Sequence, residues 1–373
     1  LIGYFVNYRS ILLTADQKNY IVSSYLQSAN VIKTIVQIGL CYYYQNYYLW
    51  ILIELTFGII GSFILNYKIN KEYPWLNANI KNGKRYFKRY PQIIKSTRQV
   101  FVHKIKDFLL MQSDQILIFA FVSLKMVAYY GNYTLLTSKI ILLFDSVLNS
   151  VSAGIGNLVA EGNNKKILNV FWELMCIRYF IAGFVVAMVY LFIEPFITLW
   201  LGKEYILSHS ILILLMVNTY IILSRGVVDN FNYAYGHFAD TWSAWAEGGL
   251  NLGITFLLAP RFGVSGILLG KITSLILIVI WWKPYYLFKS GFKKEIQEYW
   301  KQVWKFYFIF STSFFSILII RSFIPVDIIN WISFIKYNLV LTTIYLIIYS
   351  VQFLLFAPGI ELLKTRIYSL IKH

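Results

Sequence analysis

The run VFWELMCIRYFIAGFVVAMVYLFI, from Val170 to Ile193, decides the fold class of this chain. It contains only two charged residues, Glu173 and Arg178, and it exceeds the roughly 20 apolar residues that an α-helix needs to cross a bilayer. Long apolar stretches of this kind are typical of transmembrane segments. The run therefore predicts a membrane-spanning helix.

The rest of the 373 residues repeats this pattern, and residues 1–13 resemble the end of one further helix. A hydrophobic fraction of 58% and a mean hydropathy of +0.60 exceed what a soluble core could hide. We predict an all-α integral membrane protein with about ten complete transmembrane helices plus a partial one. The expected spans are 27–45, 47–66, 105–123, 127–150, 170–193, 207–225, 243–259, 263–283, 304–323 and 333–356.

The net charge of +17 is explained by the positions of the basic residues. Most Lys and Arg residues fall between the apolar runs on one side of the predicted membrane, chiefly in 67–106, in 283–305 and after residue 356. Because loops rich in Lys and Arg stay in the cytoplasm, the C-terminus is predicted to be cytoplasmic, and nucleic acid is not expected as a partner. Cys41 and Cys176 have no metal-ligand spacing, so no disulfide, metal or cofactor is predicted.

Charged residues inside the spans form a repeated pattern. Each costs roughly 2.5–3.5 kcal/mol on insertion scales, so each requires a partner or a role. Lys33 and Glu54 lie on successive antiparallel helices, and Glu247 and Lys271 repeat this arrangement about 215 residues later with the signs exchanged. The spacing predicts two salt bridges and two lobes. The alternative is two local salt bridges that arose by chance.

Several short motifs, taken in order, resemble the Wzx-type polysaccharide flippases of the multidrug/oligosaccharidyl-lipid/polysaccharide (MOP) exporter superfamily. They are YRS at 8–10, ADQK at 15–18, SDQILI at 113–118, YGNY at 130–133, SAGIGNLVA at 152–160, FITLWLG at 196–202, EGGLNL at 247–252 and FGVSGI at 262–267. The resemblance implies a two-lobed MATE/MOP-like helical bundle with about fourteen spans when complete. It also implies that this chain is an N-terminally truncated fragment, lacking three helices and the start of a fourth.

The implied cargo is an undecaprenyl-pyrophosphate-linked oligosaccharide that crosses the bacterial inner membrane for lipopolysaccharide (O-antigen) or capsule biosynthesis. Membrane lipids and polysaccharide polymerase or assembly proteins are the implied partners, and the fragment alone is expected to be inactive. One alternative is a membrane-embedded glycan polymerase or acyltransferase, which the short outer loops disfavour. Another is a MATE-type exporter of small molecules, which the basic residues in the spans disfavour.

A transported pyrophosphate would require cations that face a water-filled cavity. The candidates are Arg9, Lys139, Arg178, Arg225 and Lys271, with two alternatives: Arg9 as an interfacial anchor, and Arg225 as a local pair with Asp229. Asp114 and Asp145 are candidates for Na⁺ or H⁺ coupling, or else neutralise a nearby lysine. The full set of ion-coupling or charge-pairing candidates is Lys33, Glu54, Asp114, Asp145 and Glu247.

The expected organisation has four parts. Residues 1–66 form the remainder of an N-terminal lobe, and 67–104 form a basic cytoplasmic linker. Residues 105–283 form the C-terminal lobe, and 284–373 form two additional transmembrane helices with a cytoplasmic tail.

Overall fold

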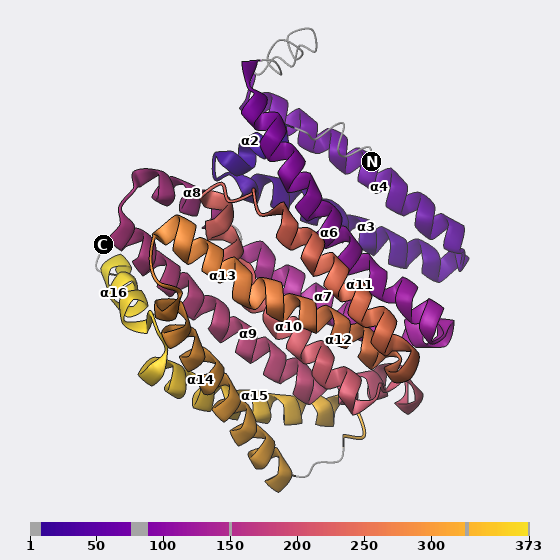
Figure 1. Ribbon diagram of the computed structural model, residues 1–373. Coiled ribbons are helices and arrows are strands. Elements are labelled where there is room, and N and C mark those ends of the chain that lie inside the picture. Colours follow the sequence, from indigo (N-terminus) through magenta and orange to yellow (C-terminus); the bar gives the residue numbers. More distant parts are fainter. Residues whose placement is uncertain (1–8, 76–88, 149–150, 325–327, 372–373) are drawn as a thin grey trace. The chain divides into compact units, whose positions relative to one another are not determined.

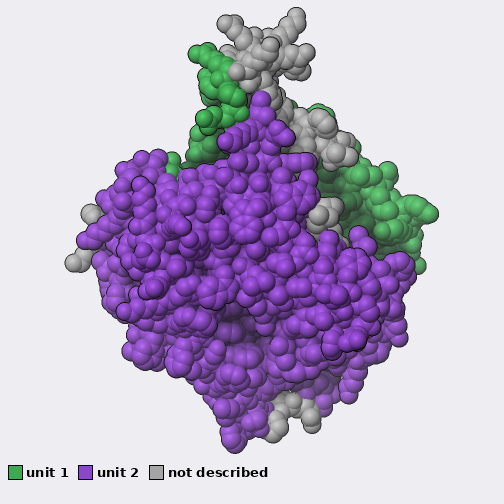
Figure 2. All heavy atoms as spheres, in the orientation of Figure 1, with its two compact units in different colours: residues 1–93, 150–157 green, residues 94–149, 158–373 purple. Residues whose placement is uncertain are grey.

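The computed structural model describes residues 9–75, 89–148, 151–324 and 328–371, and these residues form helices and connecting turns without any strand (Figure 1). They divide into two compact units, drawn in separate colours in Figure 2. Unit 1 comprises residues 1–93 and 150–157, and unit 2 comprises residues 94–149 and 158–373.

Unit 1 is built on a helical hairpin. The short helix α2 (Ser10–Ala15) precedes the two long helices α3 (Asn19–Tyr44) and α4 (Tyr47–Glu72). Gln45 turns the chain with a left-handed backbone, φ 47°, and the Asn46 side chain accepts a hydrogen bond from the Tyr48 N–H at the start of α4. A small core, with Leu13, Leu65 and Ile69 fully buried, joins α2 to the hairpin.

Unit 2 contains most of the described helices. In chain order they are α6 (Pro91–Phe121), α7 (Leu124–Leu148), α8 (Ser152–Glu161), α9 (Asn164–Trp200), α10 (His209–Ala234), α11 (Thr241–Phe262), α12 (Val264–Ser274), α14 (Ile296–Phe323), α15 (Trp331–Phe356) and α16 (Ile360–Ile371). Residues 91–93 of α6 belong to unit 1, and α8 is divided, with residues 152–157 in unit 1 and residues 158–161 in unit 2. A 3-10 turn, η2 (Lys203–Tyr205), links α9 to α10.

The helix that begins with α12 continues as one apolar segment from Val264 to Phe292. Beyond α12 it is π-helical at η3 (Leu275–Trp282), α-helical at α13 (Lys283–Tyr286) and π-helical again at η4 (Leu287–Phe292). The π-helical winding flanks Pro284, which has no backbone N–H to donate. Wide turns of this kind are often found near functional sites.

The α11–α12 hairpin is packed closely at two glycines. A Cβ at Gly266 would lie 2.5 Å from the carbonyl oxygen of Leu258, and one at Gly270 would lie 2.4 Å from Oγ1 of Thr255. Small residues allow helix backbones to approach each other inside a membrane. Gly266 and Gly270 therefore set the distance between α11 and α12.

The α14–α15 hairpin packs on α9 through tyrosines. The hydroxyl groups of Tyr345 and Tyr349 donate hydrogen bonds to the carbonyl oxygens of Gly183 and Tyr179, at 3.2 and 2.9 Å. A Cβ at Gly183 would lie 2.1 Å from the Tyr349 hydroxyl, so the glycine provides the space for this ring. The last two long helices are thereby fixed to the rest of unit 2.

Each of the ten predicted spans falls on a helix. Six described helices are long and apolar enough to cross a membrane: 47–72, 164–200, 209–234, 264–292, 296–323 and 331–356. The other four predicted spans lie on α3, α6, α7 and α11, which carry the charged residues Lys33, Asp114, Asp145 and Glu247, respectively. The exact number of spans, the four-part organisation and the cytoplasmic C-terminus stay predictions.

The helix boundaries differ from the predicted ones around the basic segment. Helix α4 continues to Glu72, and α6 begins at Pro91, well before the expected start near residue 105. Proline suits the first turn of a helix because its missing N–H is not needed there. Residues 76–88, which belong to the predicted basic linker and include Lys81, Lys84 and Arg85, lie outside the described residues.

Candidate functional site: a charged seam in unit 2

One face of α11 is polar over most of its length and completely enclosed. Ser243, Glu247, Asn251 and Thr255 recur every fourth residue, and none is more than 2% exposed. A spacing of four keeps these side chains on one side of the helix. Asp240, in the loop before α11, extends this line and is 4% exposed. We call these five residues and their charged partners the polar seam.

Helix α6 supplies partners from the opposite side of the seam. Lys106 follows His103 by three residues and Asp114 follows it by eleven, so the three side chains share a face of α6. Lys106 Nζ lies 3.0 Å from Oε2 of Glu247, and the side chains are 10% and 1% exposed. This pair joins α6 to the middle of α11.

The second pair joins α6 to α12. Lys271 Nζ donates to Oδ2 of Asp114 at 2.7 Å, and the Tyr130 hydroxyl of α7 donates to the same oxygen at 3.1 Å. All three side chains are buried. Oδ1 of Asp114 and Oε1 of Glu247 are enclosed and have no hydrogen-bond partner among the described residues.

Asp240 is the centre of the third group of contacts in the polar seam. Its Oδ2 accepts hydrogen bonds from Lys283 Nζ at 2.8 Å, Ser243 Oγ at 2.9 Å and Trp282 Nε1 at 3.1 Å. The contact of Oδ1 with His103 Nε2 is looser, at 3.5 Å.

The contacts of Asp240 determine its protonation. Burial acts to raise the pKa of Asp240, but His103, the ammonium of Lys283 and the Ser243 hydroxyl outweigh it and hold the pKa well below its usual range. Nearby His237 has a lowered pKa, chiefly because burial disfavours its charged form. Asp240 is therefore a fixed negative charge at physiological pH.

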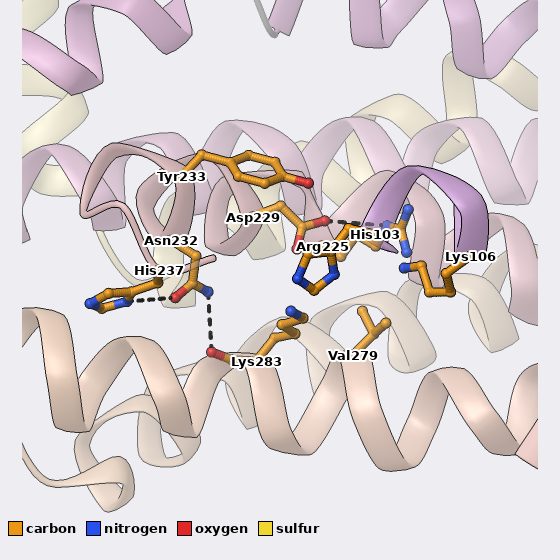
Figure 3. A pocket seen from close by; sticks show the side chains of 9 residues that line it. All are labelled: His103, Lys106, Arg225, Asp229, Asn232, Tyr233, His237, Val279 and Lys283. Atoms are coloured by element: carbon orange, nitrogen blue, oxygen red, sulfur yellow. Dashed lines mark hydrogen bonds and ion pairs between the residues drawn. The ribbon is translucent and has the colours of Figure 1, made fainter. Parts of the chain in front are cut away.

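A small polar cavity of about 40 Å³ lies at this end of the seam (Figure 3). Lys106 of α6, Arg225 of α10 and Lys283 of α13 converge on it, together with the ring of His103. The volume allows roughly three water molecules. A Lys side chain carries three N–H donors and an Arg side chain carries five, so the lining is rich in hydrogen-bond donors.

Carboxylates balance the cations of this cavity. Arg225 Nε lies 3.5 Å from Oδ2 of Asp229, one turn later on α10, as the i, i+4 spacing predicted. With the pairs Lys106–Glu247 and Lys283–Asp240, each of the three cations has an acidic partner. The site is therefore a network of paired charges inside the helix bundle.

The other predicted cations do not line this cavity. Arg178 is 2% exposed, and its Nη1 lies 2.5 Å from Oδ1 of Asp145. Arg9 donates to Oδ1 of Asn66 at 3.0 Å in unit 1, and Lys139 is exposed on α7. Of the five proposed substrate-binding cations, Arg225 alone among the described residues lines the cavity.

The predicted pairing of Glu247 with Lys271 is wrong. Glu247 pairs with Lys106 and Lys271 pairs with Asp114, so both acquire partners from α6. The α11–α12 hairpin does bring the two residues onto adjacent helices, but α6 brings an opposite charge to each of them. The sequence argument considered only neighbours within one hairpin.

The predicted pairing of Lys33 with Glu54 is confirmed within unit 1. Lys33 Nζ lies 2.7 Å from Oε1 of Glu54, and the amide of Gln37, 1% exposed, donates to Oε2 at 3.0 Å. The contact joins α3 to α4 at similar depth. Whether either residue takes part in ion coupling stays a prediction.

Charge reversal tests the Lys33–Glu54 contact. Lys33→Glu alone places two carboxylates side by side and is expected to lower the melting temperature in detergent, and Glu54→Lys alone is expected to do the same with two ammonium groups. The double variant Lys33→Glu/Glu54→Lys restores opposite charges and should recover most of the loss. A double variant no more stable than the single ones would disprove the contact.

Sequence reasoning missed four residues of the site. His103 and Lys106 lie within α6, Asp240 directly precedes α11, and Lys283 is the first residue of α13. The four-residue spacing of Ser243, Glu247, Asn251 and Thr255 was a usable signal, because a membrane helix with one polar face indicates a buried polar path. Among the described residues, no three His, Cys, Asp or Glu side chains gather as a metal site.

The six long apolar helices define a multi-pass α-helical membrane protein. The fold matches that of a solved structure, the lipid II flippase MurJ in its inward closed conformation, with a TM-score of 0.54 and 15% sequence identity. The match covers 87% of this chain, which spans 65% of the length of that one. No protein-family model and no curated protein sequence matches this chain.

This likeness confirms the predicted fold class, an all-α membrane bundle with a fold like that of the flippase. The narrower Wzx assignment stays a prediction.

Proposed function

We propose that this chain is part of a flippase that moves a lipid-linked sugar precursor across a membrane. The cavity of Lys106, Arg225 and Lys283 carries the proposal, because the anionic link of such a cargo is strongly disfavoured at low dielectric unless cations face it. The link would take these donors over from the carboxylates that pair with them in this structure. The fold shared with a lipid II flippase supports it. This chain spans 65% of the length of that flippase, and the activity is proposed for the protein as a whole.

The finer parts of the proposal rest on the sequence resemblance. The cargo is an undecaprenyl-pyrophosphate-linked polysaccharide repeat unit, used for lipopolysaccharide or capsule biosynthesis, and the location is a bacterial inner membrane. Coupling to Na⁺ or H⁺ is a further proposal. Asp114 and Asp145 each face a basic side chain, so an incoming ion would compete with Lys271 or Arg178.

A flipping assay tests the role of the cavity. Full-length protein would be reconstituted in vesicles with a fluorescent lipid-linked oligosaccharide, and its transfer between leaflets would be measured by quenching from outside. Arg225→Gln is expected to slow transfer by about tenfold, equivalent to roughly 1.4 kcal/mol, because one cation leaves the anion site. Lys336→Gln is the matched control, since Lys336 lies exposed on α15 and outside the cavity.

Two results would contradict the proposal. Wild-type vesicles that flip no faster than protein-free ones would reject the flippase. Equal losses in Arg225→Gln and Lys336→Gln would reject the cavity as the anion site.

A further inference from the structure

An apolar groove lies on unit 2, separate from the polar cavity. It has a volume of about 510 Å³, and its walls come from α9, α10, η3 and α14. The rings of Tyr220 and Phe310 stack with centroids 4.7 Å apart, and Phe310 stacks on Phe314 at 5.5 Å. A wall of packed rings is rigid, so the groove is formed in advance of any ligand.

The groove is about as long as one leaflet of a bilayer is thick. On α14 its lining extends from Tyr307 to Leu318, which corresponds to roughly 16 Å along the helix axis. The hydrocarbon core of a bilayer is about 30 Å thick, so a single leaflet contributes about 15 Å. The length suits one acyl chain of a bilayer lipid, and it is short for an undecaprenyl chain.

Tryptophans mark one end of the groove. The rings of Trp304 and Tyr307 lie 5.6 Å apart, which connects the groove to Trp304, and Trp281 lies 4.6 Å from Trp300 beside it. Trp281 and Trp304 are 53% and 61% exposed. Exposed tryptophans are typical of the head-group level of a membrane.

The same end of the groove is positively charged. Lys301 and Lys305 are exposed on the first turns of α14, adjacent to Trp300 and Trp304. The segment 293–305 contains four lysines and two glutamates, and Glu298 already pairs with Lys294 at 2.6 Å. Basic residues at this level attract anionic head groups by about 1 kcal/mol each.

We propose that this groove is a binding site for an anionic phospholipid of the bilayer. One acyl chain occupies the aromatic groove between α10 and α14, and the phosphate lies at the tryptophan level against Lys301, which is three residues before Trp304 on the surface of α14. The proposal is independent of the transported cargo.

Native mass spectrometry of the detergent-purified full-length protein tests this site. Delipidated protein is titrated with phosphatidylglycerol, with phosphatidylcholine of the same chains, and with undecaprenyl phosphate. Wild type is expected to bind one phosphatidylglycerol several-fold more tightly than phosphatidylcholine. Ser311→Trp, which places a ring in the groove, is expected to weaken this binding by about tenfold.

Two matched variants separate the chain site from the head-group site. Lys301→Gln should reduce the preference for phosphatidylglycerol while keeping phosphatidylcholine binding, and Lys336→Gln, an exposed lysine of α15, should change neither. Ser322→Trp, on the same helix outside the groove, controls for Ser311→Trp, and circular dichroism checks that each variant is folded.

Three outcomes would overturn the proposal. They are unchanged phosphatidylglycerol binding in Ser311→Trp, no head-group preference in wild type, and displacement of phosphatidylglycerol by undecaprenyl phosphate in wild type but not in Ser311→Trp. The last would assign the groove to the cargo tail.

Discussion

Lys271→Met is expected to lower the free energy of unfolding by about 3–5 kcal/mol, because it leaves the carboxylate of Asp114 charged and without its cation inside the bundle. Lys271 and Asp114 are 9% and 6% exposed, so water cannot replace the lost ammonium. The hydroxyl of Tyr130, 3.1 Å from the same oxygen, compensates only in part. Thermal unfolding of the full-length protein in detergent measures the loss.

A double variant separates loss of the ion pair from a packing defect. Asp114→Asn together with Lys271→Met removes both charges and should recover most of the stability, since an uncharged buried pair is often no less stable than an ionic one. Lys336→Met, an exposed lysine of α15, should change little. A double variant as unstable as Lys271→Met alone would show that the ion pair is not the cause.

The second large effect is expected at the α11–α12 crossing. Gly266→Ala would place a Cβ 2.5 Å from the carbonyl oxygen of Leu258 and 2.7 Å from the backbone nitrogen of Ala259. Backbone atoms cannot rotate away as a side chain can, so the two helices must separate. We expect a loss of about 1–3 kcal/mol in the free energy of unfolding, measured by thermal unfolding in detergent.

Gly253 provides the matched control on the same hairpin. A Cβ at Gly253 meets no atom within 4 Å, so Gly253→Ala should be neutral or should stabilise α11 by up to about 1 kcal/mol. The two substitutions are chemically identical and differ in expected sign. Equal melting temperatures for both variants would rule out the close crossing.

The sequence could predict the helices and the hairpins because both depend on local patterns. Apolar runs separated by polar turns located the helices, and the turn at Gln45-Asn46 placed Lys33 opposite Glu54. Each of these arguments uses residues that lie close together in the chain.

The seam could not be predicted in the same way because its partners are distant in sequence. Lys106 and Glu247 are 141 residues apart, and Asp114 and Lys271 are 157 residues apart. Only the packing of α6 against α11 and α12 selects these partners. The nearest opposite charge along the hairpin was therefore a poor guide to the actual pairs.

The paired charges of the seam have a consequence for how the protein responds to voltage. An elementary charge that moves through a potential of 100 mV changes its energy by about 2.3 kcal/mol. Lys106, Lys271 and Lys283 are matched by Glu247, Asp114 and Asp240, so these three pairs together carry no net charge. If α6, α11 and α12 shift as one body, the electric field does no net work on these pairs, and a voltage-dependent step must draw its charge from elsewhere in the protein or from the cargo.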